Sequence, residues 1–144
     1  MKTPYDSAMR VQQQQVDSAR VAITRQISQI DTIDREKQSV VAAMQREIEI
    51  AMQQTGLPSE AYRARMRALH QRLKDERAEA DARLVKLRSD ATVVFGELRA
   101  IEGVADRYRN EEEMVVARTE QARADDFAAA AFIKATAGRR RNSG

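Results

Sequence analysis

The sequence has no cysteine and no tryptophan, only two prolines, and aromatic residues at 4% of its 144 positions. Without cysteine, the chain forms neither disulfides nor thiolate metal sites, and its redox compartment stays open. No apolar run approaches the roughly 20 residues that cross a bilayer. Charged residues among the first twenty, which include Asp6, Arg10 and Asp17, are incompatible with a secretory signal peptide. We therefore expect a cytoplasmic protein that does not insert into a membrane.

The residues that are abundant are those of long helices. Alanine, arginine, glutamate, glutamine and leucine are frequent and 33% of the chain is charged, which is typical of helices that bury only a narrow seam. The net charge is +3, and its excess lies in Arg139, Arg140 and Arg141, because residues 1–59 carry 7 basic and 7 acidic side chains and residues 60–137 carry 15 of each. Near-neutral helices with few aromatics argue against nucleic-acid binding.

Apolar residues recur along one helix face over residues 6–54. One set of apolar residues is spaced seven apart, and only Lys37 among its positions is not apolar. A second set lies beside it with less regular spacing. The first set is Met9, Val16, Ile23, Ile30, Met44 and Ala51, and the second is Ala19, Ile27, Ile33, Val40, Val41 and Ile48. Alternating steps of three and four predict a helix whose stripe faces a partner.

A second, more regular helix is predicted over residues 60–135. Its seven-residue line is Met66, Leu73, Ala80, Leu87, Val94, Ile101, Tyr108, Val115 and Ala122. The companion line holds Leu84, Ala91, Leu98 and Ala105, preceded one position out of phase by Tyr62 and Leu69. We therefore expect the seam to shift slightly near Arg77.

The hinge between the two helices, residues 55–59, has the signals of a helix end followed by a helix start. Gly56 fits the left-handed residue that follows a helix, with Leu57 packing back on Met52. Pro58 cannot continue the first helix, and Ser59 is placed to cap the second. So short a link predicts that the helices fold back on each other.

The sequence thus predicts an all-α fold of two long helices in an antiparallel coiled-coil hairpin. With the turn centred near residue 57, position i on the first helix faces approximately position 114 minus i on the second, so that Ile30 faces Leu84. The hairpin would form a single domain over residues 1–137, in which the longer second helix has a C-terminal overhang. Residues 138–144 would form a basic, flexible tail.

The sequence contains no pattern of residues that is typical of an active site. The only histidine, His70, stands among arginines without an evident partner. Phosphate-binding glycine loops, dinucleotide fingerprints and metal-ligand sets are absent from the sequence. Acidic runs such as residues 111–113 alternate with arginines, as on solvated helix faces. We therefore expect no enzymatic activity, no cofactor and no metal.

Two surface features remain. Residues 61–77 hold six bases against two acids, whereas residues 97–113 hold six acids against three bases. Such an asymmetry steers a protein toward partners of opposite charge. The overhang also keeps large apolar side chains, which imply either a partner or a fold-back onto the coiled coil. They are Met114, Val115, Val116, Phe127, Phe132 and Ile133.

Three features together resemble a known family: a first helix shorter than the second, the turn region IEIAMQQTGLPSEAY, and a C-terminal section ending DDFAAAAFIKA. They are similar to the FliJ/YscO family, the stalk proteins of the export ATPase in flagellar and injectisome type III secretion. The resemblance covers nearly the whole chain. It implies a hairpin that inserts into the hexameric export ATPase ring, promotes its assembly and activity, and links it to the export gate at the membrane-embedded apparatus and to export chaperones.

The resemblance also implies positions for these partners. The ATPase ring would contact Met9, Arg10, Val16, Ile101, Tyr108 and Arg109. The export gate, a membrane protein, would contact Arg65, Leu69 and Leu73, although the family's bulky aromatic in this region has no counterpart in the chain. Export chaperones would contact Val115, Val116, Phe127, Phe132 and Ile133.

The alternative hypothesis is a self-assembling coiled-coil scaffold or a membrane-associated structural protein. Its hairpins would associate laterally through the arginine-rich face. The stalk hypothesis predicts an elongated monomer in isolation, whereas the scaffold hypothesis predicts concentration-dependent polymers or lipid binding.

Overall fold

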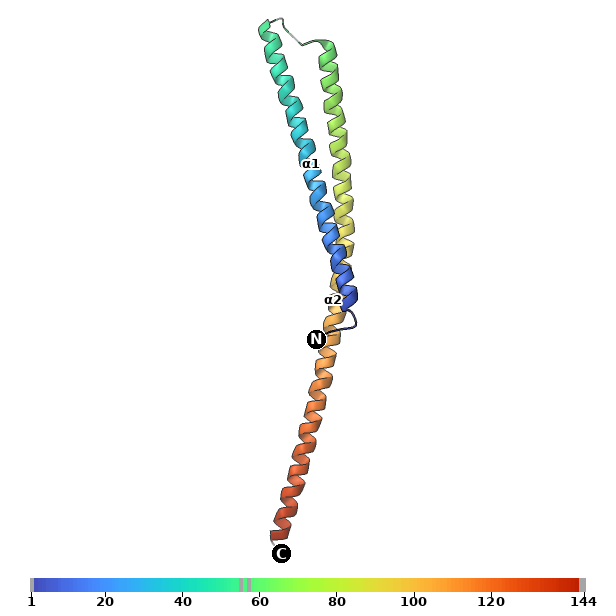
Figure 1. Cartoon of the computed structure of the whole chain (residues 1–144), viewed down its shortest axis with the longest axis vertical. Coiled ribbons are helices and arrows are strands. Elements are labelled where there is room, and N and C mark those ends of the chain that lie inside the picture. The colour runs from blue at the N-terminus through green and yellow to red at the C-terminus, as the bar shows by residue number, and fades with distance from the viewer. Residues whose placement is uncertain (1, 55, 57, 143–144) are drawn as a thin grey trace. The chain divides into compact units, whose positions relative to one another are not determined.

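The computed structural model describes residues 2–54, 56 and 58–142, which form two helices, α1 (Asp6–Gln54) and α2 (Glu60–Asn142). α2 is the longer, with 83 residues against 49. The helices pack against each other as a hairpin (Figure 1). The predicted all-α hairpin with a longer second helix is therefore confirmed.

The chain divides by its contacts into two units. One unit combines Met1–Arg10 with Arg99–Gly144, and the other is Val11–Leu98. The single hairpin domain over residues 1–137 was predicted because heptad spacing continues along α2 through the boundary between these units, and it stays a prediction.

α1 begins with a cap built from Thr3 and Asp6. The backbone N–H of Thr3 donates to the Asp6 carboxylate at 3.1 Å, and its hydroxyl donates to the same carboxylate at 2.7 Å. The backbone N–H of Tyr5 donates to the Thr3 hydroxyl oxygen at 3.3 Å. Pro4, in the turn that leads into α1, has no N–H to satisfy. This bonding satisfies polar groups that a helix start leaves without intrahelical partners.

The hinge has the predicted end and start signals at the residues that the structure describes. Gly56 has a φ of 104°, in the left-handed region that glycine adopts without Cβ strain, and its N–H donates to the Ala51 carbonyl at 2.6 Å. The Ser59 hydroxyl oxygen accepts from the N–H of Tyr62 at 3.2 Å, so its role as the cap of α2 is confirmed. The expected packing of Leu57 lies outside the described residues.

The end of α2 differs from the prediction. The helix continues to Asn142, where the sequence predicted an end near residue 135, and the three arginines expected in a flexible tail form its last turn. Cationic side chains in a last turn interact favourably with the partial negative charge of the helix C-terminus. This interaction is a physical reason for the helix to continue through them.

In the unit Val11–Leu98, the two helices meet along a heptad seam without a phase shift. The buried or half-buried positions of α1 along it are Gln12, Val16, Ala19, Ile23, Gln26, Ile30, Ile33, Lys37, Val40 and Met44. Those of α2 are Met66, His70, Leu73, Arg77, Ala80, Leu84, Leu87, Ala91, Val94 and Leu98. Because the steps alternate between three and four on both helices, each seam stays on one face.

The α1 seam contains glutamines where the sequence predicted isoleucine and valine. Ile27, Val41 and Ile48 are 46%, 41% and 37% exposed and flank the seam. Gln12 and Gln26 are only 7% and 5% exposed. On α2 the regular seam continues through residue 77 with arginine and histidine, and Tyr62 and Leu69, which were predicted out of phase, are half-buried beside it.

The buried glutamines bond across the hairpin. The Gln26 side-chain amide donates to the Ala80 carbonyl at 2.9 Å. The Gln12 amide donates to the Val94 carbonyl at 3.1 Å and to the Glu97 carboxylate at 2.8 Å. The glutamines lie two heptads apart and so do the two carbonyls, so both bonds support one register.

Small side chains let the helices approach at these points. Ala80 is 5% exposed and forms a buried cluster with Ile30 and Ile33, against which Leu84 packs. The facing of Ile30 and Leu84 predicted from the hinge position is therefore confirmed. A methyl group at position 80 leaves its carbonyl within reach of a glutamine side chain.

Candidate interaction surfaces

The unit of Met1–Arg10 and Arg99–Gly144 contains five of the six residues expected to contact an ATPase ring. The rings of Tyr5 and Tyr108 meet edge to face, with centroids 6.3 Å apart and planes at 78°. Ala105 is fully buried. The start of α1 thus packs on α2 through an aromatic pair and a small residue, which fixes the position of Tyr108.

Charged groups surround this aromatic contact. Arg109 pairs with Asp106 at 3.0 Å. Hydrogen bonds from the side chain and then the backbone of Thr3 lower the pKa of Asp6, and the positive charges of Arg109 and Arg10 act in the same direction. The carboxylate at the start of α1 is therefore held in its charged form next to two arginines.

The expected ring-contact residues differ in accessibility. Arg10 is exposed, whereas Met9, Ile101, Tyr108 and Arg109 are half-buried. Val16 belongs to the unit Val11–Leu98 and is 1% exposed. Its side chain therefore holds the hairpin together and is not offered to a partner.

The residues expected to contact the export gate also differ in solvent accessibility. Arg65 is exposed and Leu69 is half-buried. Leu73 is 1% exposed, inside the seam. A partner on this part of α2 would therefore meet Arg65 and Leu69, while Leu73 supports the helix behind them.

An apolar groove near the hinge was not predicted from the sequence. A hollow of about 420 Å³ lies between α1 and α2, and a second of about 340 Å³ shares Val41, Gln45 and His70 with it and extends to Lys37. We call these two hollows the hinge groove. The first is lined by Val41, Met44, Gln45, Ile48, Arg67, His70 and Gln71. The signal for it was the seven-residue spacing of Val41 and Ile48 beside the seam, which the sequence analysis assigned to the seam itself.

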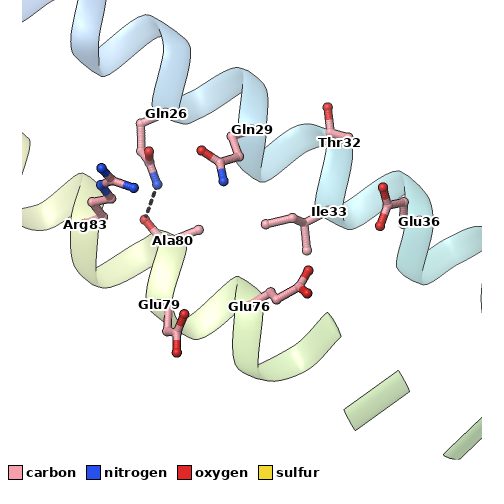
Figure 2. A pocket seen from close by; sticks show the side chains of 9 residues that line it. All are labelled: Gln26, Gln29, Thr32, Ile33, Glu36, Glu76, Glu79, Ala80 and Arg83. Carbon is pink, nitrogen blue, oxygen red and sulfur yellow. Dashed lines mark hydrogen bonds between the residues drawn. The ribbon is translucent and has the colours of Figure 1, made fainter. Parts of the chain in front are cut away.

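A separate hollow of about 380 Å³ in the same unit is polar, as Figure 2 shows. Its lining includes Gln26, whose amide bonds the Ala80 carbonyl, the three carboxylates of Glu36, Glu76 and Glu79, and the guanidinium of Arg83. The lining also includes the Thr32 hydroxyl, which donates to the Ser28 carbonyl at 3.1 Å. Among the described residues, no group of three or more His, Cys, Asp or Glu side chains is placed to hold a metal ion.

The expected chaperone-contact residues lie on an exposed part of α2. We call residues 111–133 the C-terminal segment. Every side chain from residue 113 to residue 135 is exposed, and Phe127, Phe132 and Ile133 are 78%, 72% and 67% exposed. Val115 and Val116 are 54% and 49% exposed. The segment carries six acids and two bases, so it is both apolar and acidic.

Two further findings bear on identity. In the part of the chain that the structure describes, neither helix is apolar enough over a sufficient length to cross a membrane. No protein-family model, no curated protein and no solved structure matches this chain.

Proposed function

We propose that this chain is a non-enzymatic coiled-coil stalk protein of a type III secretion or flagellar export apparatus. The proposal rests on the resemblance to the FliJ/YscO family. The observation that carries it is the two-helix hairpin, with a capped hinge between Gln54 and Glu60 and a longer second helix. The protein would act in the cytoplasm, at the membrane-embedded apparatus, through the partners that it holds there.

The mechanism follows from an asymmetric object inside a near-symmetric ring. A two-helix hairpin cannot make equal contacts with six subunits of an export ATPase. It therefore stabilises the closed, nucleotide-competent state of some subunits and the open state of others. Only such a difference in contact free energy can shift the conformations of the ring. The hairpin would promote ring assembly and turnover without a catalytic residue of its own.

The ring contact is proposed at the unit that contains the Tyr5 and Tyr108 pair. Arg10, together with the accessible parts of Met9 and Arg109, forms its surface. Because the aromatic pair and the Thr3 cap fix the helices behind these residues, the surface is preorganised for binding. Val16 contributes through hairpin packing.

The other two partners are proposed at separate surfaces. The export gate would bind the start of α2 at Arg65 and Leu69. Export chaperones would bind the C-terminal segment, where Phe127, Phe132 and Ile133 offer apolar side chains to a groove or helix of a partner.

The test is ATPase turnover of the cognate hexameric export ATPase with and without the purified chain. We expect turnover to rise and the two proteins to co-migrate. Arg10→Glu should reduce the stimulation several-fold by placing a negative charge at the proposed contact. Arg25→Glu, the same change at another exposed arginine of α1, should leave the stimulation intact. Unchanged turnover together with separate migration would refute the proposal.

A further inference from the structure

The hinge groove is positively charged as well as apolar. Val41, Met44 and Ile48 supply its apolar lining, while Lys37 and Arg67 border it. The residues that line the two hollows include no aspartate or glutamate. The Glu60 carboxylate is shared by Arg63 and Arg67, each at 2.8 Å, so this trio keeps a net positive charge. A ligand for this groove must combine apolar side chains with carboxylates.

The C-terminal segment has this complementary chemistry. Residues 125–133 carry Asp125 and Asp126 and no lysine or arginine, opposite in sign to Lys37 and Arg67 at the groove. Asp125, Ala129 and Phe132 follow at intervals of four and three, and Asp126 precedes Ile133 by seven. On a helix, these intervals place two carboxylates and two large apolar groups on one face. That face has the two aspartates at its N-terminal end and Phe132 and Ile133 at its C-terminal end.

The charged and apolar residues are also equally spaced along the hinge groove and along the C-terminal segment. Lys37 and Met44 lie seven residues apart on α1, as Asp126 and Ile133 do on α2, and seven residues of helix span about 10 Å. If the two helices lie parallel, the Asp126 carboxylate meets Lys37 while Ile133 enters the groove near Met44. Both contacts form in a single placement.

We propose that the hinge groove binds residues 125–133 of a second copy of this chain. The exposed apolar residues of the C-terminal segment would thereby be covered when no other partner occupies them. Because the groove accommodates only a few helical turns, association should be weak, with a dissociation constant on the order of 100 µM. The proposal does not rest on the stalk function, and it replaces the sequence-based expectation of a monomer with weak self-association.

The test is sedimentation of the full chain over a range of concentrations and salt. We expect reversible association that weakens as salt rises, since opposite charges carry part of the contact. Lys37→Glu and Asp126→Lys should each weaken association about tenfold. Mixing the two variants should restore it, because the reversed groove of one then matches the reversed segment of the other. Lys86→Glu and Asp90→Lys are matched controls at exposed positions outside both surfaces and should change little.

The outcomes separate second-copy binding from its alternatives. Circular dichroism of each variant should match that of the unmodified chain, so that lost association reports contact and not unfolding. Ile133→Ser should also weaken association, since it removes the apolar anchor. The proposal would be overturned if the chain stayed monomeric at every concentration, if the single variants had no effect, or if mixing them did not restore association. The groove would then be a binding site for a different protein.

Discussion

Two regions of the hairpin in the unit Val11–Leu98 share one heptad spacing and differ in how closely their helices pack. The central region pairs residues 12–34 with 77–98, and the hinge region pairs residues 35–54 with 60–76. The buried residues of the central region are Gln12, Val16, Gln26, Ile30, Ile33, Ala80 and Ala91, whereas among the described residues of the hinge region only Leu73 is buried. The helices diverge toward the hinge in Figure 1.

The seam side chains explain this difference. In the central region, alanines allow close approach and glutamines bond carbonyls across the seam. In the hinge region, Lys37, Arg63 and His70 occupy inward positions. These side chains are bulkier than alanine, and a long side chain such as that of Lys37 covers apolar surface while its charged end reaches water. Heptad spacing therefore determines which face is turned inward, while side-chain size and polarity determine how near the helices come.

The largest expected effect comes from truncating one isoleucine in each region. Ile30→Ala should cost about 2–4 kcal/mol of unfolding free energy, because Ile30 is 8% exposed and its loss leaves a cavity against Ile33 and Ala80. Ile48→Ala should cost less than about 1 kcal/mol, because Ile48 is 37% exposed. Urea unfolding followed by circular dichroism measures both. Equal losses would mean that the two regions pack equally well.

Helix bounds were predictable from the sequence because they depend on local chemistry. α1 begins and ends at the predicted residues 6 and 54, and α2 begins at the predicted residue 60. Capping groups and a left-handed glycine act within a few residues of the chain, so each is readable without its tertiary context. The end of α2 was harder to predict from the sequence, since three arginines are compatible with both a solvated tail and a helix terminus.

The groove and the buried glutamines were not predictable in the same way. Gln26 and Ile27 are neighbours, and hydropathy favours burying the isoleucine. The seam instead turns Gln26 inward, because the heptad phase of Ile23, Ile30 and Ile33 leaves Ile27 outside it. The glutamine is then satisfied by a carbonyl 54 positions away. Such a partner is visible only once the register of the two helices is known.

A smaller effect should separate a seam glutamine from a surface glutamine. Gln26→Ala removes the bond to the Ala80 carbonyl and should cost about 1 kcal/mol of unfolding free energy. Gln13, which is exposed and bonds Asp17 within its own helix at 3.1 Å, is the matched control, and Gln13→Ala should cost only a few tenths of a kcal/mol, at most about 0.5. Thermal unfolding of both variants provides the comparison. If they are equally stable, the interhelical bond contributes nothing to the tighter packing of the central region.

The smallest effect should be a pH dependence confined to the hinge region. The hydrogen bond from Arg67, followed by the charges of Arg63 and Arg67, lowers the pKa of Glu60. Because its pKa is lowered in the folded state, the carboxylate stabilises that state above its unfolded pKa, and this stabilisation is lost as the pH falls through the folded pKa. Glu60→Gln should therefore melt slightly earlier than the unmodified chain at neutral pH, and the difference should vanish in acid. Repeating the comparison with Arg67→Met in both chains should shrink the difference at neutral pH, since the strongest partner is then absent. A difference that persists unchanged in acid would show that the charge of Glu60 contributes nothing to it. A difference that is lost in acid but does not depend on Arg67 would show that the carboxylate acts through the helix dipole or Arg63, and not through Arg67, which borders the hinge groove.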